Sequence, residues 1–181
     1  MNNRISRWAR ILGVGIFAGI AAGGAAGVCA RIAMRIVADS IGRMGNFSIP
    51  GTLSILLVGV GAGIPLALSY VVLKRFIPGR ELVKGLLFGA VLFLTLGLPF
   101  IFLGVEPDFE LSPVLGRILF SIIPFVYGIV LALALPIADG FIPLPRREWR
   151  VMIVYGVAAF FGGLSLLFIG ALFVSAFMAS A

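Results

Sequence analysis

The 181-residue chain has no histidine, one cysteine and few charged residues. Without histidine it lacks the commonest general base, the commonest metal ligand and the imidazole ligand of haem. The lone Cys29 cannot form an internal disulfide or a thiolate cluster, and its apolar neighbours indicate a packing residue. These absences exclude Ser-His-Asp and Cys-His catalysis and histidine-containing zinc sites. We therefore expect a chain that is not an enzyme and that binds no metal or other cofactor.

Charge is also scarce, because Lys, Arg, Asp and Glu together make up 12% of the residues while 61% are hydrophobic and 24 are glycine. A soluble domain usually has about 25% charged residues, so this chain has too little polar surface to cover a body in water. We expect a multi-pass membrane protein, located in the cytoplasmic (inner) membrane of a bacterium. The net charge of +7 then reflects basic loops on one side of the membrane rather than nucleic-acid binding.

Five apolar stretches are long enough to cross a bilayer as helices, which takes about 20 residues each. They cover residues 11–36, 52–73, 83–104, 114–137 and 151–178. Helices are expected because lipid cannot satisfy backbone N–H and C=O groups, and the alternation of a barrel strand is absent. The sequence therefore predicts an all-α integral membrane protein with five spans in one domain, residues 1–181.

Basic residues predict the orientation of the spans. Ten of the 14 lie before span one, between spans two and three, or between spans four and five: Arg4, Arg7, Arg10, Lys74, Arg75, Arg80, Lys84, Arg146, Arg147 and Arg150. The positive-inside rule then places the N-terminus inside and the C-terminus outside. An alternative is that the first stretch is a secretory signal cleaved near Cys29, but its apolar run is longer than a usual signal core.

An internal repeat is the most informative pattern. Residues 63–78 match residues 128–143 at eight of 16 positions, including Phe-Ile-Pro in both copies, and Arg80-Glu81 then corresponds to Arg147-Glu148. We interpret this as a duplication of a two-span hairpin, with repeats at 51–110 and 111–181 in the same orientation. The first helix and its outer loop, residues 1–50, then stand outside the repeat.

Span one carries four glycines at four-residue spacing: Gly15, Gly19, Gly23 and Gly27. Small residues on one ridge let two helix backbones approach closely, which is how membrane helices associate. Two interpretations stay open. The ridge packs against helices of the same chain, or it forms the interface with a second copy or a partner in a larger membrane complex.

Arg31, Arg35 and Arg117 are the basic residues closest to the membrane on the predicted outer side. About 20 residues of helix separate Arg10 from the outer boundary, so Arg31 and Arg35 can extend their guanidinium groups into the headgroups. Alternatively, the three converge to bind an anionic solute or lipid headgroup, or pair with nearby acidic residues such as Asp39.

Proline and glycine also mark possible hinges within the spans. Pro65 and Pro124 remove a helical hydrogen bond inside spans two and four, and Gly63 lies two residues before Pro65. Tyr70 and Tyr127 are among the few polar side chains in the spans, and we expect them to make hydrogen bonds between helices.

Two functions are compatible with these features. The first is a non-enzymatic membrane protein that acts through helix contacts, as an accessory, assembly or scaffold subunit or as a homo-oligomer. The alternative is a small transporter or channel with a path between the two hairpins, in which the outer arginines select an anion. Membrane lipids are expected partners of either.

Overall fold

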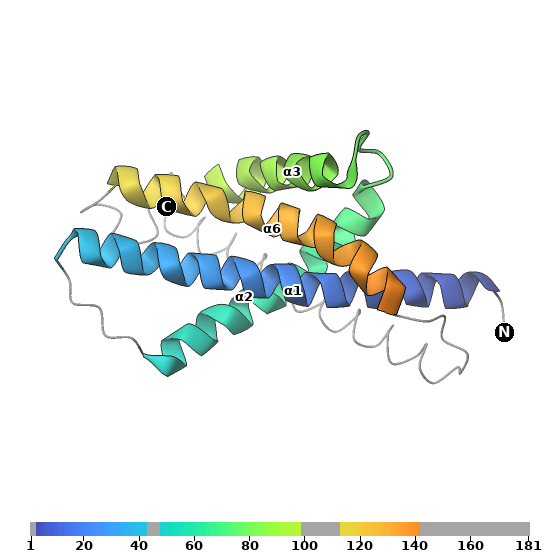
Figure 1. Ribbon diagram of the computed structural model, residues 1–181, viewed down its shortest axis with the longest axis horizontal. Coiled ribbons are helices and arrows are strands. Elements are labelled where there is room, and N and C mark those ends of the chain that lie inside the picture. The colour runs from blue at the N-terminus through green and yellow to red at the C-terminus, as the bar shows by residue number, and fades with distance from the viewer. Residues whose placement is uncertain (1–2, 43–47, 99–112, 142–181) are drawn as a thin grey trace, which may run out of the picture.

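A computed structural model of the chain describes residues 3–42, 48–98 and 113–141 (Figure 1). Every element in these ranges is helical: α1 (Asn3–Ser40), α2 (Ile49–Leu73), α3 (Glu81–Leu92), the π-helix η1 (Phe93–Gly97) and α6 (Pro113–Phe141). The prediction of an all-α fold is confirmed for this part of the chain. The fifth predicted span, 151–178, lies outside the described residues.

Three of these helices are long and apolar enough to cross a membrane: Arg10–Ser40, Ile49–Leu73 and Val114–Phe141. They contain the predicted spans 11–36, 52–73 and 114–137, and the chain is therefore an integral membrane protein by the length and composition of its helices. The third predicted span, 83–104, is described as far as Leu98, and its helix begins at Glu81.

Two glycines with positive φ shape the helix ends. Gly42, with φ of 70°, ends α1 in the left-handed conformation that glycine adopts without strain. Gly79, with φ of 113°, makes the tight turn between α2 and α3. At the end of α3 the backbone widens into η1, and the Thr95 hydroxyl donates to the Val91 carbonyl at 2.8 Å.

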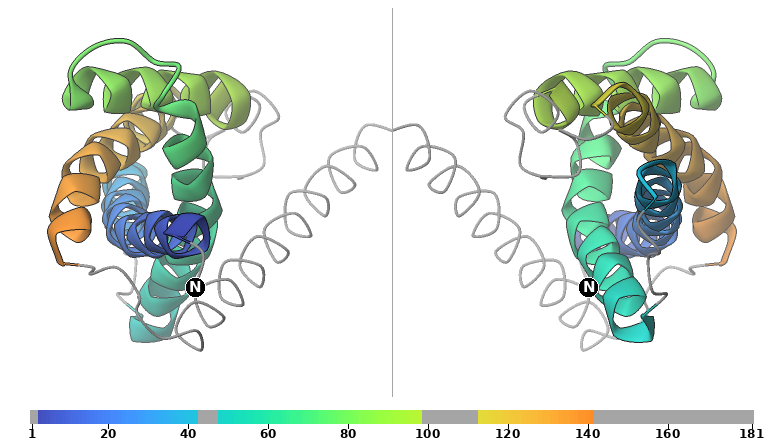
Figure 2. Two further views of the ribbon diagram at one scale, coloured as in Figure 1. Left: turned by 90° about the vertical axis from the view of Figure 1, so that its right-hand side faces the viewer. Right: turned by 90° about the vertical axis from the view of Figure 1, so that its left-hand side faces the viewer.

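Helix α1 lies between α2 and α6, and α3 packs on the far side of α6 (Figure 2). Helix α2 crosses α1 obliquely, whereas α6 runs along α1 (Figure 1). Gly15 faces Leu68 while Gly27 faces Leu56, so α1 and α2 are antiparallel. Helix α6 is also antiparallel to α1 (Figure 1). Helices α2 and α6 therefore point the same way, and they carry most of the matching sequences 63–78 and 128–143.

An ion pair joins the N-terminal part of α1 to the C-terminal end of α6. The Arg10 guanidinium lies 3.2 Å from a carboxylate oxygen of Asp139 and donates to the Asp139 carbonyl oxygen at 2.7 Å. We call this the basic end of the bundle. It also holds the turn between α2 and α3 and the first turn of α3, with the basic residues Lys74, Arg75, Arg80 and Lys84. The opposite end holds Arg31, Arg35 and Arg117.

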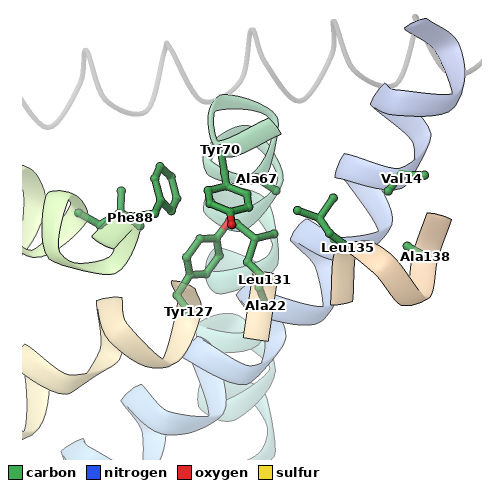
Figure 3. Packing of buried hydrophobic residues seen from close by; sticks show 11 residues of the cluster. Val14, Ala22, Ala67, Tyr70, Phe88, Tyr127, Leu131, Leu135 and Ala138 are labelled. Carbon is green, nitrogen blue, oxygen red and sulfur yellow. The ribbon is translucent and has the colours of Figure 1, made fainter. Parts of the chain in front are cut away.

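The core is built from small residues of α1 and larger side chains of the other helices. Ala18 and Ala22 are fully buried, as are Ile64, Tyr70 and Leu131. Figure 3 shows how labelled side chains from α1, α2, α3 and α6 meet in this cluster. Small residues on α1 let the other helices approach it closely, so α1 is the centre of the described bundle.

Candidate functional site

The glycine ridge of α1 packs against two glycines of α2. A Cβ added to Gly63 would lie 2.6 Å from the Gly19 carbonyl oxygen and 2.7 Å from the Gly23 Cα, and one added to Gly59 would lie 2.6 Å from the Gly23 carbonyl oxygen. Real Cβ atoms do not approach other atoms this closely, so the two backbones are in direct contact. We call Gly19, Gly23, Gly59 and Gly63 the α1–α2 glycine contact.

Helices α3 and α6 meet in the same way. A Cβ added to Gly128 would clash with the Gly85 carbonyl oxygen and lie 3.0 Å from the Gly89 backbone nitrogen. A Cβ added to Gly89 would lie 2.8 Å from the Pro124 carbonyl oxygen. We call Gly85, Gly89 and Gly128 the α3–α6 glycine contact.

The two contacts resemble each other at their closest atoms. Gly63 lies against the Gly19 carbonyl oxygen and the Gly23 nitrogen. In the same way, Gly128 lies against the Gly85 carbonyl oxygen and the Gly89 nitrogen. Glycine thus occupies the point of closest approach in both helix pairs, where any side chain would separate the backbones.

The ridge faces a helix of the same chain in the structure. Gly15, Gly19, Gly23 and Gly27 all face α2 of the same chain, as the first of the two open interpretations expected. Close glycine contacts join α1 with α2 and α3 with α6, and α1 also packs on α6. The interpretation of spans two and three as one repeat unit, with span one outside the repeat, stays a prediction. The glycines of the two contacts also correspond in the sequence. Gly85 and Gly89 follow Gly19 and Gly23 by 66 positions, and Gly128 follows Gly63 by 65.

Two tyrosine hydroxyls lie in the core, and they differ in their hydrogen bonding. The Tyr127 hydroxyl donates to the Gly63 carbonyl oxygen at 2.6 Å, which ties α6 to α2 next to the α1–α2 glycine contact. Tyr70 is fully buried and its ring packs 5.0 Å from that of Phe88, yet its hydroxyl has no hydrogen-bond partner among the described residues (Figure 3). The expected hydrogen bond between helices is therefore made by Tyr127 and not, within the described part, by Tyr70.

Replacing each tyrosine by phenylalanine is expected to have opposite effects on stability. Tyr127→Phe removes a hydrogen bond between helices and is expected to lower the free energy of unfolding by roughly 0.6 to 1.7 kcal/mol. Tyr70→Phe removes a buried hydroxyl without a described partner and is expected to raise it by about 1 kcal/mol. Denaturant titration in detergent micelles measures both. A loss of stability in Tyr70→Phe as large as that in Tyr127→Phe would show that the Tyr70 hydroxyl has a partner.

The candidate hinge residues lie in unbroken helices. Helix α2 continues through Pro65 and α6 continues through Pro124. Gly63 is held on one side by the α1–α2 glycine contact and at its carbonyl by Tyr127. Bending at these residues remains a prediction, and the contacts of Gly63 would have to break for it to occur there.

The three arginines of the opposite end do not share one environment. The Arg35 Nε lies 3.3 Å from an Asp39 carboxylate oxygen, one helical turn away, and both side chains are largely exposed. Arg31 is half-buried and Arg117 is exposed. Counting from the pair Arg10 and Asp139 at about 1.5 Å per residue, Arg31 and Arg117 lie at the same level of the antiparallel helices α1 and α6. The structure thus shows the pairing expected for Arg35, and convergence of the three arginines on an anion remains a prediction.

Within residues 3–42, 48–98 and 113–141, no three His, Cys, Asp or Glu side chains gather into a group that could hold a metal ion. Comparison with known proteins gives no further assignment: no family model matches the chain, and no curated protein or solved structure matches it significantly.

Proposed function

We propose that this chain is a non-enzymatic multi-pass membrane protein of the bacterial cytoplasmic membrane that acts through helix contacts, as an accessory, assembly or scaffold subunit or as a homo-oligomer. The single observation that carries the proposal is an open face of α2, opposite the α1–α2 glycine contact. The glycine ridge itself no longer supports it, because that ridge is used inside the chain.

The open face consists of residues that recur every three or four positions on α2: Ser54, Val58, Gly61, Pro65, Ser69 and Val72. No described atom lies within 4 Å of the place where a Gly61 Cβ would stand. Pro65 has no N–H, so it cannot donate to the Gly61 carbonyl as other residues do four positions along a helix. Lipid cannot satisfy that carbonyl either, so a glycine with an accessible backbone favours contact with another helix.

The test of this function is the substitution Gly61→Leu. We expect the variant to fold, because the site has room, and to lose the complex or oligomer that the wild-type chain forms in mild detergent. Native mass spectrometry and light scattering measure the assembly. Gly140→Leu is the matched control, since that glycine also has no described atom within 4 Å of its missing side chain.

Three outcomes of that experiment can be distinguished. Loss of the assembly in Gly61→Leu alone supports the proposal. An unchanged assembly with unchanged stability contradicts it. An unchanged assembly with lowered stability means that the open face is covered within the chain, for which residues 151–178 are the available segment.

We further propose a five-span layout with the N-terminus inside and the C-terminus outside, built by duplication. The equivalence of the two glycine contacts supports different repeat units from those first expected: α1 with α2, and α3 with α6. The fifth predicted span, rather than the first, then stands outside the repeat.

A small transporter or channel is the second candidate, and the Tyr70 hydroxyl is the observation that favours it. A buried polar group without a partner in the membrane is costly, and such groups often mark a path or a site. Chloride flux into proteoliposomes that is lost in Arg31→Ala and Arg117→Ala would support this candidate. An equal flux through protein-free vesicles would remove it.

A further inference from the structure

Three cationic side chains stand together in the turn between α2 and α3. Lys74 follows the last residue of α2, Arg75 comes next, and Arg80 precedes the first residue of α3. None of the three has a salt bridge to a described residue. Glu81, the first residue of α3, is engaged with the Lys84 ammonium at 2.8 Å. The turn therefore presents positive charge that the described residues leave unneutralised.

The backbone of the same turn adds to this positive potential. Helix α3 has no side-chain cap at Arg80, and its first helical bond runs from the Lys84 N–H to the Arg80 carbonyl at 3.0 Å. The N–H groups of the first turn, from Glu81 to Val83, thus have no acceptor within the helix, and the helix dipole is positive at this end. Oxygen atoms of a phosphate are favourable partners for such groups.

Apolar side chains border the charged turn. Phe76 is 74% exposed within the turn, and Leu73, Leu82 and Val83 beside it are also exposed. An exposed phenylalanine next to cations at a membrane surface suits a ligand that is anionic at one end and apolar at the other. A free inorganic anion would use the cations and leave the aromatic ring in water.

The duplicated sequence places a second phenylalanine in the same position. Phe141 at the end of α6 corresponds to Phe76 and is 78% exposed. Both copies continue as Ile-Pro and then Arg-Glu in the sequence. The repeat thus retains an exposed aromatic residue at the same end of two parallel helices, and in both copies the sequence continues to a basic residue.

We propose that the turn between α2 and α3 binds the phosphate headgroup of an anionic phospholipid, with Lys74, Arg75, Arg80 and the start of α3 around the phosphate and Phe76 among the acyl chains. This site lies at the basic end, away from the three arginines of the opposite end, and it does not depend on the proposed function. It would fix the depth and tilt of α2 and α3 in the membrane.

The experiment compares two lipids that differ only in the headgroup, dioleoyl phosphatidylglycerol and dioleoyl phosphatidylcholine. Each is titrated into the full chain in detergent and counted by native mass spectrometry. We expect a preference for the anionic lipid, because a basic residue near the surface contributes roughly a fivefold change in affinity. Added salt is expected to lower this preference, because it screens exposed charges.

Substitutions then locate the site. The triple variant Lys74→Gln, Arg75→Gln, Arg80→Gln is expected to lose the preference by about tenfold or more. Phe76→Ser is expected to weaken both lipids and keep their ratio. The matched control removes the same charge at the opposite end, Arg31→Gln, Arg35→Gln and Arg117→Gln, and is expected to keep the preference. Circular dichroism and gel filtration verify that each variant is folded.

Several results would overturn the proposal. Equal binding of the two lipids by the wild-type chain would do so, as would an equal loss of preference in the control variant. Displacement of the lipid by millimolar inorganic phosphate would assign the turn to a soluble anion instead. If the triple variant does not fold, the salt titration of the wild-type chain decides, because a preference that salt leaves unchanged excludes a phosphate held by these cations.

Discussion

Replacing Gly23 by alanine is expected to lower the free energy of unfolding by about 3 kcal/mol, the upper part of the range for overpacked cores. The added methyl group would clash with the Gly59 carbonyl oxygen and lie 3.0 Å from the Val60 Cα. Both are backbone atoms, which cannot rotate away as the end of a side chain can. Helices α1 and α2 must therefore separate along the whole contact, and the loss extends beyond the one residue.

Gly24→Ala is the matched control for this prediction. The two glycines are adjacent and gain the same helix propensity, yet the nearest atom to a Cβ at Gly24 is a side-chain methyl of Val60 at 4.0 Å. Gly24→Ala is expected to raise the free energy of unfolding by up to about 1 kcal/mol. Denaturant titration in micelles measures both variants. Shifts of the same sign and size would contradict a backbone contact at Gly23.

Replacing Gly128 by leucine is expected to separate α3 from α6, at a cost of about 3 kcal/mol or more. The Gly85 carbonyl oxygen and the Gly89 nitrogen occupy the space that the new side chain needs. The ring contact between Phe93 and Phe125, whose centroids are 5.9 Å apart, would be lost with it.

Gly140→Leu provides the comparison for Gly128→Leu, because it makes the same change in α6 where no described atom lies within 4 Å. It is expected to leave the free energy of unfolding nearly unchanged. Thermal unfolding followed by circular dichroism distinguishes the two. If Gly128→Leu is tolerated as well as Gly140→Leu, the α3–α6 glycine contact does not hold these helices together.

The sequence predicted the packing face of α1 but not its partner. Four-residue spacing places Gly15 to Gly27 on one side of a helix whatever lies against it. Which helix it meets depends on matching small residues elsewhere, and Gly59 and Gly63 stand in a stretch where Gly61 is equally small. Only the structure separates the packed glycines from the open one.

The predicted repeat rests partly on matches at the ends of helices, and such matches do not predict which helices pack together. Phe-Ile-Pro and Arg-Glu are rare enough to stand out, but they lie at or beyond the ends of α2 and α6 and give no information about which helix packs on which. The glycines of the two contacts do show which helices pack together. Because glycine is common in membrane helices, their separation by 65 or 66 positions is not significant in the sequence alone and becomes informative only when the structure shows the contacts.

Helix ends and polar pairs were predicted less well than apolar spans. Helices α1 and α6 extend beyond 11–36 and 114–137, because hydropathy marks the apolar stretch while the helix continues through its polar flanks. The pair of Arg10 and Asp139 joins residues far apart in sequence, which spacing cannot reveal. Likewise, the sequence does not show that the Tyr127 hydroxyl reaches the Gly63 carbonyl while the Tyr70 hydroxyl has no partner among the described residues.

The central claim is that these helices cross a membrane with the basic end on one side and the opposite end on the other. Labelling of single cysteines with a membrane-impermeant maleimide, in a Cys29→Ser background, tests it most directly. We expect Ser48→Cys to react in intact cells, Arg80→Cys to react only after the cells are opened, and the exposed, apolar Leu57→Cys to resist in both. Reaction of Ser48→Cys and Arg80→Cys from the same side, or free reaction of Leu57→Cys, would contradict a bundle that spans the membrane.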